Sequence, residues 1–502
     1  MKNKGIKLTA LMLILFMAVG FLPSCAGKKG SGKKEIKIVT MYNHPVFEMA
    51  AQEYMKLHDD VSILPQAIPY DGYPEWLRVQ MIAKTAPEVV FLEEPDTYAN
   101  LGLLTDFNSY MGEKSSYDTA ATWAESFEEP YIDIAKDQNS KLNWVPFSIY
   151  GIGLFVNADQ YKAAGLEKMP ETINEYIQNN AKLKQSGYTP LTCAIKLNDA
   201  QMVWPLEMMH KAFFRDLIPE INLLHGDSFA FDANNPKSVI GEKISPDEIN
   251  VAFKKGLIDP AKSPRFKSMY EIMLSLVPGL NSDFLSKDGN EVYGDFANAK
   301  QTQFLNGTWY IPSLAGYFSD FKKGGNEDKI FNYNIIPFPK PTNENTEFLK
   351  AGAPNDIVQI RNGFAVPSYI SDEKKEIAVD FIRFMTGPEM MKKMFELENP
   401  DTGFRYIGDI PLVKGVIGME EAQNLKPEIK YADMQSANLF YDDQDRDNFY
   451  MEYQDLLGKK ITLDEFLKKR SKSNSAAIER NLKLFSSAID KKWMDEQIAK
   501  IQ

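Results

Sequence analysis

The fold is decided by residues 35–92, which open with the alternating stretch Glu35-Ile36-Lys37-Ile38-Val39-Thr40-Met41-Tyr42. Apolar residues at every second position predict a β-strand. Phe47–Leu57 has apolar residues at helical spacing, and a second strand is expected near Val61–Ile68. Tyr73–Lys84 follows a helical pattern, and Pro87–Leu92 is a short apolar strand. The order strand, helix, strand, helix, strand predicts an α/β fold with a parallel sheet.

Polar side chains follow the first and third of these predicted strands. Ligands of such sheets bind in the crevice beyond the carboxyl ends of the strands. Tyr42 and Asn43 follow the first strand, and Glu93, Glu94 and Asp96 follow the third. We therefore expect a ligand-binding edge there, with Tyr42, Asn43 and Glu93 as candidate contacts.

Residues 1–24 have the organisation of a secretion signal. A positively charged start precedes the apolar run Leu8–Leu22, which is short for a transmembrane helix. Leu22-Pro23-Ser24-Cys25 resembles a bacterial lipobox, with Pro23 as the departure from the usual pattern. The resemblance implies that Cys25 is lipidated after the signal is removed; the alternative is an ordinary signal peptide with an incidental cysteine. We expect a protein anchored by lipid to the outer face of the cell membrane, with residues 25–34 as a flexible tether.

Composition narrows the class of protein further. The formal net charge is -12, and removal of residues 1–24 would delete three lysines and no acid, which lowers it to -15. Such a surface repels nucleic acid. A chain of this length is too long for one hydrophobic core, so two or more lobes are expected. Only Cys193 remains besides Cys25, so we expect no intramolecular disulfide.

Signatures of catalysis are missing from the sequence. The four histidines do not have the spacing of zinc ligands, and no G-x-S-x-G motif is present. Glu93 and Glu94 are adjacent, so on an extended segment their carboxylates point apart rather than flank one bond. The acidic run after Asp443 fails the calcium-loop pattern, which predicts a solvated loop. We expect no enzyme, no metal and no cofactor.

Several later segments keep a shared order along the chain, although each is weak alone. Together they resemble the family 1 extracellular solute-binding proteins, the sugar receptors of ABC importers. The segments that carry the resemblance are Ala83–Val90, Asn100–Phe107, Trp144–Phe147, Leu154–Asn157, Ala163–Thr172, Phe304–Trp309, Ile336–Pro339, Asn362–Pro367 and Ala378–Glu389. Ile173 and Gly387 depart from the family pattern, in which tryptophan and serine are usual.

The resemblance implies a two-lobed clamshell of the periplasmic-binding-protein type (type II), whose chain crosses the hinge more than once. The first lobe would comprise residues 35–147 and 337–388. The second lobe would comprise residues 148–336 and 389–502. Residues 243–290 match nothing in the family pattern and are expected to be helical decoration of the second lobe.

The resemblance also implies a site for carbohydrate, which needs aromatic planes for its C–H faces and polar groups for its hydroxyls. Trp309 stands at the family position of a tryptophan that stacks on sugar, although a core tryptophan is the alternative. Tyr150 follows the first hinge crossing, and Asn362 and Gly363 lead a strand into the cleft. Trp204 and Arg405 are further candidates, at the positions of a second-lobe aromatic and a cleft loop.

We therefore predict a receptor that captures a carbohydrate, more specifically an oligosaccharide, and delivers it to ABC permease subunits. The receptor is expected to be a monomer anchored by lipid. Two alternatives stay open. The same fold would serve a peptide, a polyamine or a sensor, which a cleft rich in acids such as Glu93 would favour. A secreted polysaccharide-degrading enzyme is the alternative from another class.

Overall fold

The structure of the chain is a computed structural model. It describes residues 32–41, 45–69, 72–93, 95–129, 131–137, 140–195, 201–221, 244–350, 352–353, 357–426, 441–486 and 488–501. The predicted signal, Cys25, most of the tether, Tyr42, Asn43 and Glu94 lie outside the described residues.

Nine strands of the described chain form one sheet, and their order along the main path is β2-β1-β3-β8-β4-β6-β5. Strands β7 and β9 both pair with β4. Their bounds are β1 Lys34–Thr40, β2 Val61–Ala67, β3 Val89–Leu92, β4 Val145–Asn157, β5 Leu191–Thr192, β6 Gln303–Gly307, β7 Tyr333–Pro337, β8 Ile357–Ala365 and β9 Ile410–Pro411.

The first three strands are parallel, as the sequence predicts. Ile36 is opposite Ile63 of β2, and Ile38 is opposite Val89 of β3. The helices between them, α2 (Pro45–Leu57) and α3 (Tyr73–Ala83), begin and end within two residues of the predicted bounds. The predicted α/β architecture of this part of the chain is confirmed.

The remaining helices cover the sheet and extend the second half of the chain. Those of at least nine residues are α8 Ile173–Gln185, α9 Trp204–Phe214, α11 Pro246–Lys254, α12 Pro264–Leu276, α13 Gly289–Ala297, α14 Tyr310–Lys323, α15 Asp372–Met385, α16 Pro388–Glu396, α18 Asp443–Leu457, α19 Leu463–Phe485 and α20 Ala488–Ala499. Shorter ones are α4 Asp96–Asn100, α5 Asn108–Met111, α6 Tyr131–Ile134, α7 Ala158–Ala163, α10 Ile218–Ile221 and α17 Glu420–Gln423, with single 3₁₀ turns η3 Ala124–Ser126, η4 Arg215–Leu217, η6 Val277–Gly279 and η7 Glu327–Lys329. No helix of the described chain is both long and apolar enough to span a bilayer.

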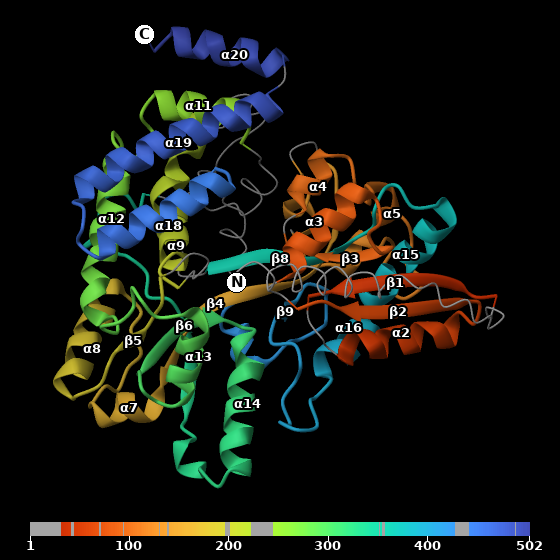
Figure 1. Cartoon of the computed structure of the whole chain (residues 1–502), viewed down its shortest axis with the longest axis horizontal. Coiled ribbons are helices and arrows are strands. Elements are labelled where there is room, and N and C mark those ends of the chain that lie inside the picture. Colours follow the sequence, from red (N-terminus) through yellow and green to blue (C-terminus); the bar gives the residue numbers. More distant parts are fainter. Residues whose placement is uncertain are drawn as a thin grey trace, which may run out of the picture.

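Strand β4 connects the two halves of the molecule. Its first residues pair with β8, from Val145 opposite Phe364 to Ile152 opposite Ile357. Its last residues pair with β6 on one side and β7 on the other. Figure 1 shows β4 and β8 in the middle of the molecule, between a group of elements with β1–β3 and a group with β5, α8 and α12. Two register shifts between Pro146 and Tyr150 mark the passage from one group to the other.

Successive residues of β4 pack against different helices, as the two faces of a strand require. Phe155 belongs to the hydrophobic cluster that includes α13 and α14, whereas Leu154 and Val156 belong to the cluster that includes α8, α9 and α12. This half of the sheet is therefore covered on both faces. Around β1–β3, α2 packs against β2 and α16, and α15 packs against β1. Helix α16 thus lies with the first half of the chain, although the predicted division places residues after 388 in the second lobe.

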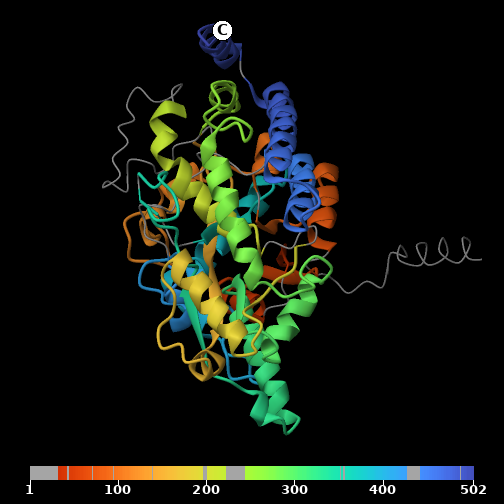
Figure 2. The ribbon, with the colours of Figure 1, turned by 90° about the vertical axis from the view of Figure 1, so that its left-hand side faces the viewer.

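The segment expected to be helical decoration contains α11, α12 and the start of α13. Helix α11 packs against both α19 and α20. Figure 2 shows α20 at one end of the molecule, beyond α11 and α19.

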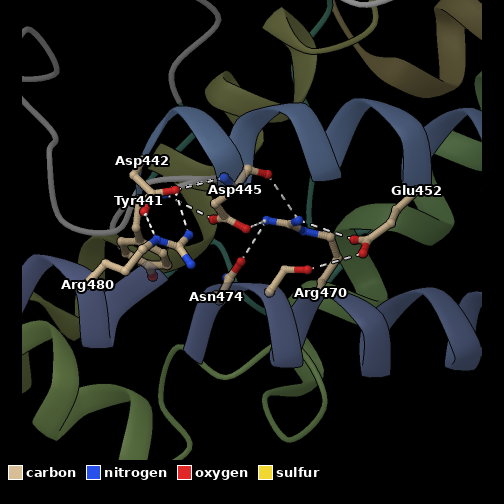
Figure 3. A network of polar contacts seen from close by, with 8 residues as sticks. Tyr441, Asp442, Asp445, Glu452, Arg470, Asn474 and Arg480 are labelled. Carbon is tan, nitrogen blue, oxygen red and sulfur yellow. Dashed lines mark hydrogen bonds and ion pairs between the residues drawn. The ribbon is translucent and has the colours of Figure 1, made fainter. Parts of the chain in front are cut away.

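The start of α18 corrects one expectation from the sequence. The acidic run after Asp443 is the first turn of this helix and not a solvated loop, and Asp442 caps it by accepting a hydrogen bond from the Asp445 backbone N–H. Asp445 is fully buried. An acid is stable there because it meets a buried arginine of α19, as Figure 3 shows.

That arginine is Arg470, which joins α18 to α19. Its Nη2 donates to Asp445 Oδ1 at 2.9 Å and to Asn474 Oδ1 at 2.6 Å, and its Nη1 lies 3.2 Å from Glu452 Oε2. The guanidinium carbon also lies over the Phe449 ring, 5.2 Å from the ring centroid. The buried cation therefore has two carboxylates around it, as Figure 3 shows, and in addition the face of the Phe449 ring.

Candidate ligand-binding site

Three of the predicted site residues form one aromatic cluster. Trp309 occupies the N-cap position of α14, immediately after the turn that follows β6. Its ring meets Tyr150 of β4 edge-on, with centroids 4.8 Å apart, and Trp204 of α9 with centroids 5.9 Å apart. The cluster therefore brings together β4, α9 and the β6–α14 turn, which are distant in the sequence.

The position of the Trp309 ring depends on a glycine and on a neighbouring tyrosine. A Cβ atom on Gly307 would lie 2.0 Å from Trp309 Cζ3, so the indole covers the backbone of this residue and only glycine leaves room for it. Trp309 Nε1 donates to Tyr293 Oη on α13 at 3.2 Å. Trp309 is partly exposed and packs against both hydrophobic clusters of the chain.

A polar junction involves the hinge strands next to this cluster. Asn362 of β8 donates through Nδ2 to Asp409 Oδ2 at 2.8 Å, and Ser148 of β4 donates through Oγ to the same oxygen at 2.9 Å. Thr308 Oγ1 donates to Asp409 Oδ1 at 3.2 Å. Burial raises the pKa of the Asp409 carboxyl to about 6, although these three hydrogen bonds oppose the shift. Asn362 Oδ1 is buried and accepts no hydrogen bond from the described residues.

The other candidates lie apart from this cluster. Gly363 is buried in β8, where a Cβ atom would lie 2.2 Å from Trp144 Cε3, so its lack of a side chain serves core packing. Glu93 directly follows β3 and is partly exposed. Arg405 lines a pocket of about 210 Å³ together with Phe404, three glutamates and two other residues. Its Nη1 is buried and has no hydrogen-bond partner in the described chain.

Another groove shares no lining residue with the Trp309 cluster. It has a volume of about 730 Å³ and lies between the end of α12 with η6 and the connection from α18 to α19. Its lining includes four leucines, Val277, Ile461 and lysines 459 and 460. It offers apolar surface but neither the aromatic faces nor the amides of the cluster around Trp309.

The histidines and acids of the described part of the chain do not form a metal-binding cluster. His210 stacks on Phe214, with ring centroids 4.5 Å apart, and burial lowers its pKa to about 3, so this imidazole is neutral at physiological pH. The described residues contain no group of three or more His, Cys, Asp or Glu side chains that would hold a metal ion.

Comparison with known proteins identifies the family. The model of the bacterial extracellular solute-binding proteins matches residues 49–424, which is more than half of the chain. This chain belongs to the bacterial extracellular solute-binding proteins. A sequence comparison with curated proteins gives no match.

Solved solute-binding proteins share the fold at low sequence identity. A chitin oligosaccharide binding protein has a TM-score of 0.61 at 15% identity, and the match covers 89% of this chain and 99% of that one. A family 1 extracellular solute-binding protein from Bifidobacterium longum subsp. infantis has a TM-score of 0.57 at 14% identity, covering 89% and 100%. The solute-binding protein RafE in complex with raffinose has a TM-score of 0.58 at 15% identity, covering 89% and 100%. The predicted two-lobed solute-binding fold is confirmed.

Sequence reasoning missed four residues that contact one another or the candidate residues Trp309 and Asn362: Ser148, Tyr293, Thr308 and Asp409. Thr308 and Gly307 belong to a recognisable turn before Trp309. Asp409 gives no signal in the sequence, because its three partners lie more than 40 positions away along the chain.

Proposed function

We propose that this protein captures an oligosaccharide between its two lobes and delivers it to the permease of an ABC importer. The observation that carries the proposal is the meeting of Trp309, Tyr150 and Trp204 where β4 passes between the two halves of the molecule. Aromatic faces match the apolar C–H faces of sugar rings. A cluster at this position contacts a ligand that lies between the lobes.

One polar group next to the cluster and one in the separate Arg405 pocket suit hydroxyl groups of a sugar. Asn362 Oδ1 is an acceptor without a hydrogen-bond partner in the described chain. Arg405 Nη1 is a donor that also has no hydrogen-bond partner there. A site with a few polar groups on a mainly apolar lining fixes the orientation of its ligand through those groups. Two solved structures with the same fold support this assignment, since one is a chitin oligosaccharide binding protein and the other is RafE in complex with raffinose.

Hinge closure is the proposed mechanism. Ligand held by one lobe offers contacts to the other, so the closed state is populated when the cleft is filled. Strands β4 and β8 form the hinge, with the register shifts of β4 as the points of bending. Raising a closed population from about 1% to 99% needs roughly 5.5 kcal/mol of differential binding. Several stacked rings and satisfied hydroxyls supply an energy of that order.

The proposed cellular setting follows from the start of the sequence. Lipidated Cys25 holds the monomeric receptor at the outer face of the cell membrane, and residues 26–34 tether it. The first lobe comprises residues 35–147 and 337–388, and we propose that α16 extends it to Glu396 because this helix packs against α2. The role requires neither a catalytic step nor a cofactor.

A thermal-shift panel tests the ligand class, because a ligand that binds only the native state raises its stability. Purified protein is heated with chito-oligosaccharides, raffinose, maltose, xylo-oligosaccharides, spermidine and short peptides. The expected result is a rise in melting temperature with at least one oligosaccharide, and none with spermidine or peptides. A rise with spermidine or peptides alone would assign the alternative solute. Release of shorter products from a labelled oligosaccharide would identify an enzyme.

A further inference from the structure

Asp409 forms hydrogen bonds with three segments that are distant from one another in the sequence. It directly precedes β9, whose two residues pair with Ser148 and Ile149 of β4. Its carboxylate accepts hydrogen bonds from β4, from β8 and from the β6–α14 turn. The donors Ser148 and Thr308 are fully buried.

The two carboxylate oxygens have different partners. Oδ2 accepts from Ser148 and from Asn362, which belong to the two strands that pass between the halves of the molecule. Oδ1 accepts from Thr308, the residue before Trp309. One rigid planar group therefore fixes the distance between the hinge strands and the turn that presents Trp309.

The backbone next to Asp409 restrains the same turn. A Cβ atom on Gly408 would lie 2.2 Å from the Thr308 carbonyl oxygen, so the two backbones are in direct contact. A glycine permits such a close approach. The contact and the hydrogen bond from Thr308 hold the turn at adjacent points.

The Asp409 carboxylate is stabilised by hydrogen bonds from neutral donors alone. Among the described residues no lysine, arginine or histidine forms an ion pair with it. Ser148, Asn362 and Thr308, which face it from β4, β8 and the β6–α14 turn, do not titrate. Arg405 on its own segment lines a separate pocket with Glu398, Glu420 and Glu421. Loss of the carboxylate would take this acceptor from the buried Ser148 and Thr308 hydroxyls, whereas Asn362 Nδ2 would keep its bond to Ser148 Oγ at 3.3 Å. A buried donor left without an acceptor costs more than the loss of one hydrogen bond.

We infer that Asp409 is a positioning residue of the proposed ligand site, which holds the Trp309 turn against both hinge strands and so governs ligand affinity without touching the ligand. The statement on affinity rests on the proposed function. The statement on the position of the turn does not, because it concerns the protein without ligand.

Two variants isolate the parts of this junction. Asp409→Asn removes the charge and replaces one acceptor oxygen by an amide NH₂ group, which faces hydrogen-bond donors instead of accepting from them. Thr308→Val keeps the shape of the side chain and removes only its bond to Oδ1, so the bonds from Ser148 and Asn362 stay. Asp380→Asn is the matched control, since Asp380 also accepts from two neutral donors, Tyr54 and Tyr117, but lies on α15 away from Trp309.

Hydrogen–deuterium exchange of the free protein is the first measurement. A hydrogen bond to a charged group is worth about 1.5–3 kcal/mol, so we expect exchange in residues 306–312 to rise by about tenfold or more in Asp409→Asn and Thr308→Val. Exchange in this segment is expected to stay unchanged in Asp380→Asn. Unchanged exchange at 306–312 in the first two variants, with both folded, overturns the inference.

Calorimetry with chitotetraose and raffinose is the second measurement. We expect both variants to bind the sugar that the wild type binds about tenfold more weakly, while Asp380→Asn binds as the wild type does. Wild-type affinity in both variants, despite faster exchange at 306–312, overturns the link to affinity. Absence of sugar binding by the wild type contradicts the proposed function, and the exchange experiment still decides whether Asp409 positions the turn.

Discussion

Two polar networks of this solute-binding protein gather side chains in opposite ways. Arg470 is a buried cation that faces two carboxylates, Asp445 and Glu452, on the helix pair α18 and α19. Asp409 is a carboxylate with neutral donors only, and these come from β4, β8 and the β6–α14 turn. In the first network a cation faces carboxylates and joins neighbouring helices. In the second a carboxylate faces neutral donors only, and these include residues of both strands that pass between the two halves of the molecule. The comparison predicts that loss of the first network mainly lowers stability, and that loss of the second mainly releases the Trp309 turn from the hinge strands.

Removal of Arg470 is expected to have the largest effect on stability. Arg470→Met leaves the buried carboxylate of Asp445 without its partner, and breaking a buried ion pair on one side costs about 3–5 kcal/mol. Urea unfolding followed by circular dichroism measures the free energy of unfolding. If the loss is below about 1 kcal/mol, the network does not stabilise the fold and the contrast with Asp409 fails.

Removal of Trp309 tests the other side of the comparison. Trp309→Ala is expected to weaken oligosaccharide binding by about 30-fold to 150-fold, from the loss of roughly 2–3 kcal/mol of buried apolar contact, and to leave the protein folded. Calorimetry measures the affinity. Trp76→Ala is the control, because Trp76 is a partly buried tryptophan of α3 that packs against Tyr73. Equal losses of affinity in the two variants would show that Trp309 acts through stability alone.

The uncompensated charge of Asp409 gives a dependence on pH. Its pKa of about 6 in the folded protein lies above the value of about 3.9 for unfolded chains, so the folded state binds this proton more tightly. The stability that protonation gives is present below about pH 4 and is lost as the pH rises to about 6. Relative to Asp409→Asn, the wild type should therefore lose about 2 kcal/mol of unfolding free energy across this range. Parallel curves for the two proteins from pH 4 to pH 7 would contradict the raised pKa.

Arg480 is expected to show the smallest effect, although it forms two hydrogen bonds with Asp442, at 2.6 Å and 2.9 Å. Its side chain is 36% exposed, and exposed ion pairs contribute about 0.2–1 kcal/mol. Arg480→Ala should lower the free energy of unfolding by less than about 1 kcal/mol in the urea experiment used for Arg470. A loss as large as that of Arg470→Met would mean that burial does not explain the difference between the two arginines.

Local patterns were enough to predict the first part of the fold. The period of apolar residues in 35–92 lies within single strands and helices, so it gave β1, α2, β2, α3 and β3 close to their observed bounds. The start of α18 was predicted wrongly as a loop, because Asp445 and its partner Arg470 are 25 positions apart. A run of acids is indistinguishable from a solvated loop until that partner is known.

In the candidate site, too, single residues could be predicted from the sequence, whereas the contacts between distant segments could not. Trp309, Tyr150 and Trp204 were predicted one by one from the order of family segments, and their mutual contact depends on how β4, α9 and the β6–α14 turn pack. Gly363 was chosen as a contact from its place before the cleft, but the ring of Trp144 covers it. Asp409 was not predicted, since its role exists only when three distant segments meet.

The length of β4 has a consequence for engineering. The thirteen residues of β4, Val145–Asn157, pair with β8 at one end and with β6 and β7 at the other. The two halves of the molecule therefore share this strand. A gene fragment that encodes one half would leave the edge of this strand open and prone to pair with other chains. Split reporters built from this receptor should therefore be cut at an exposed turn such as Gly324–Gly325, after α14, and the strand should be kept in one piece.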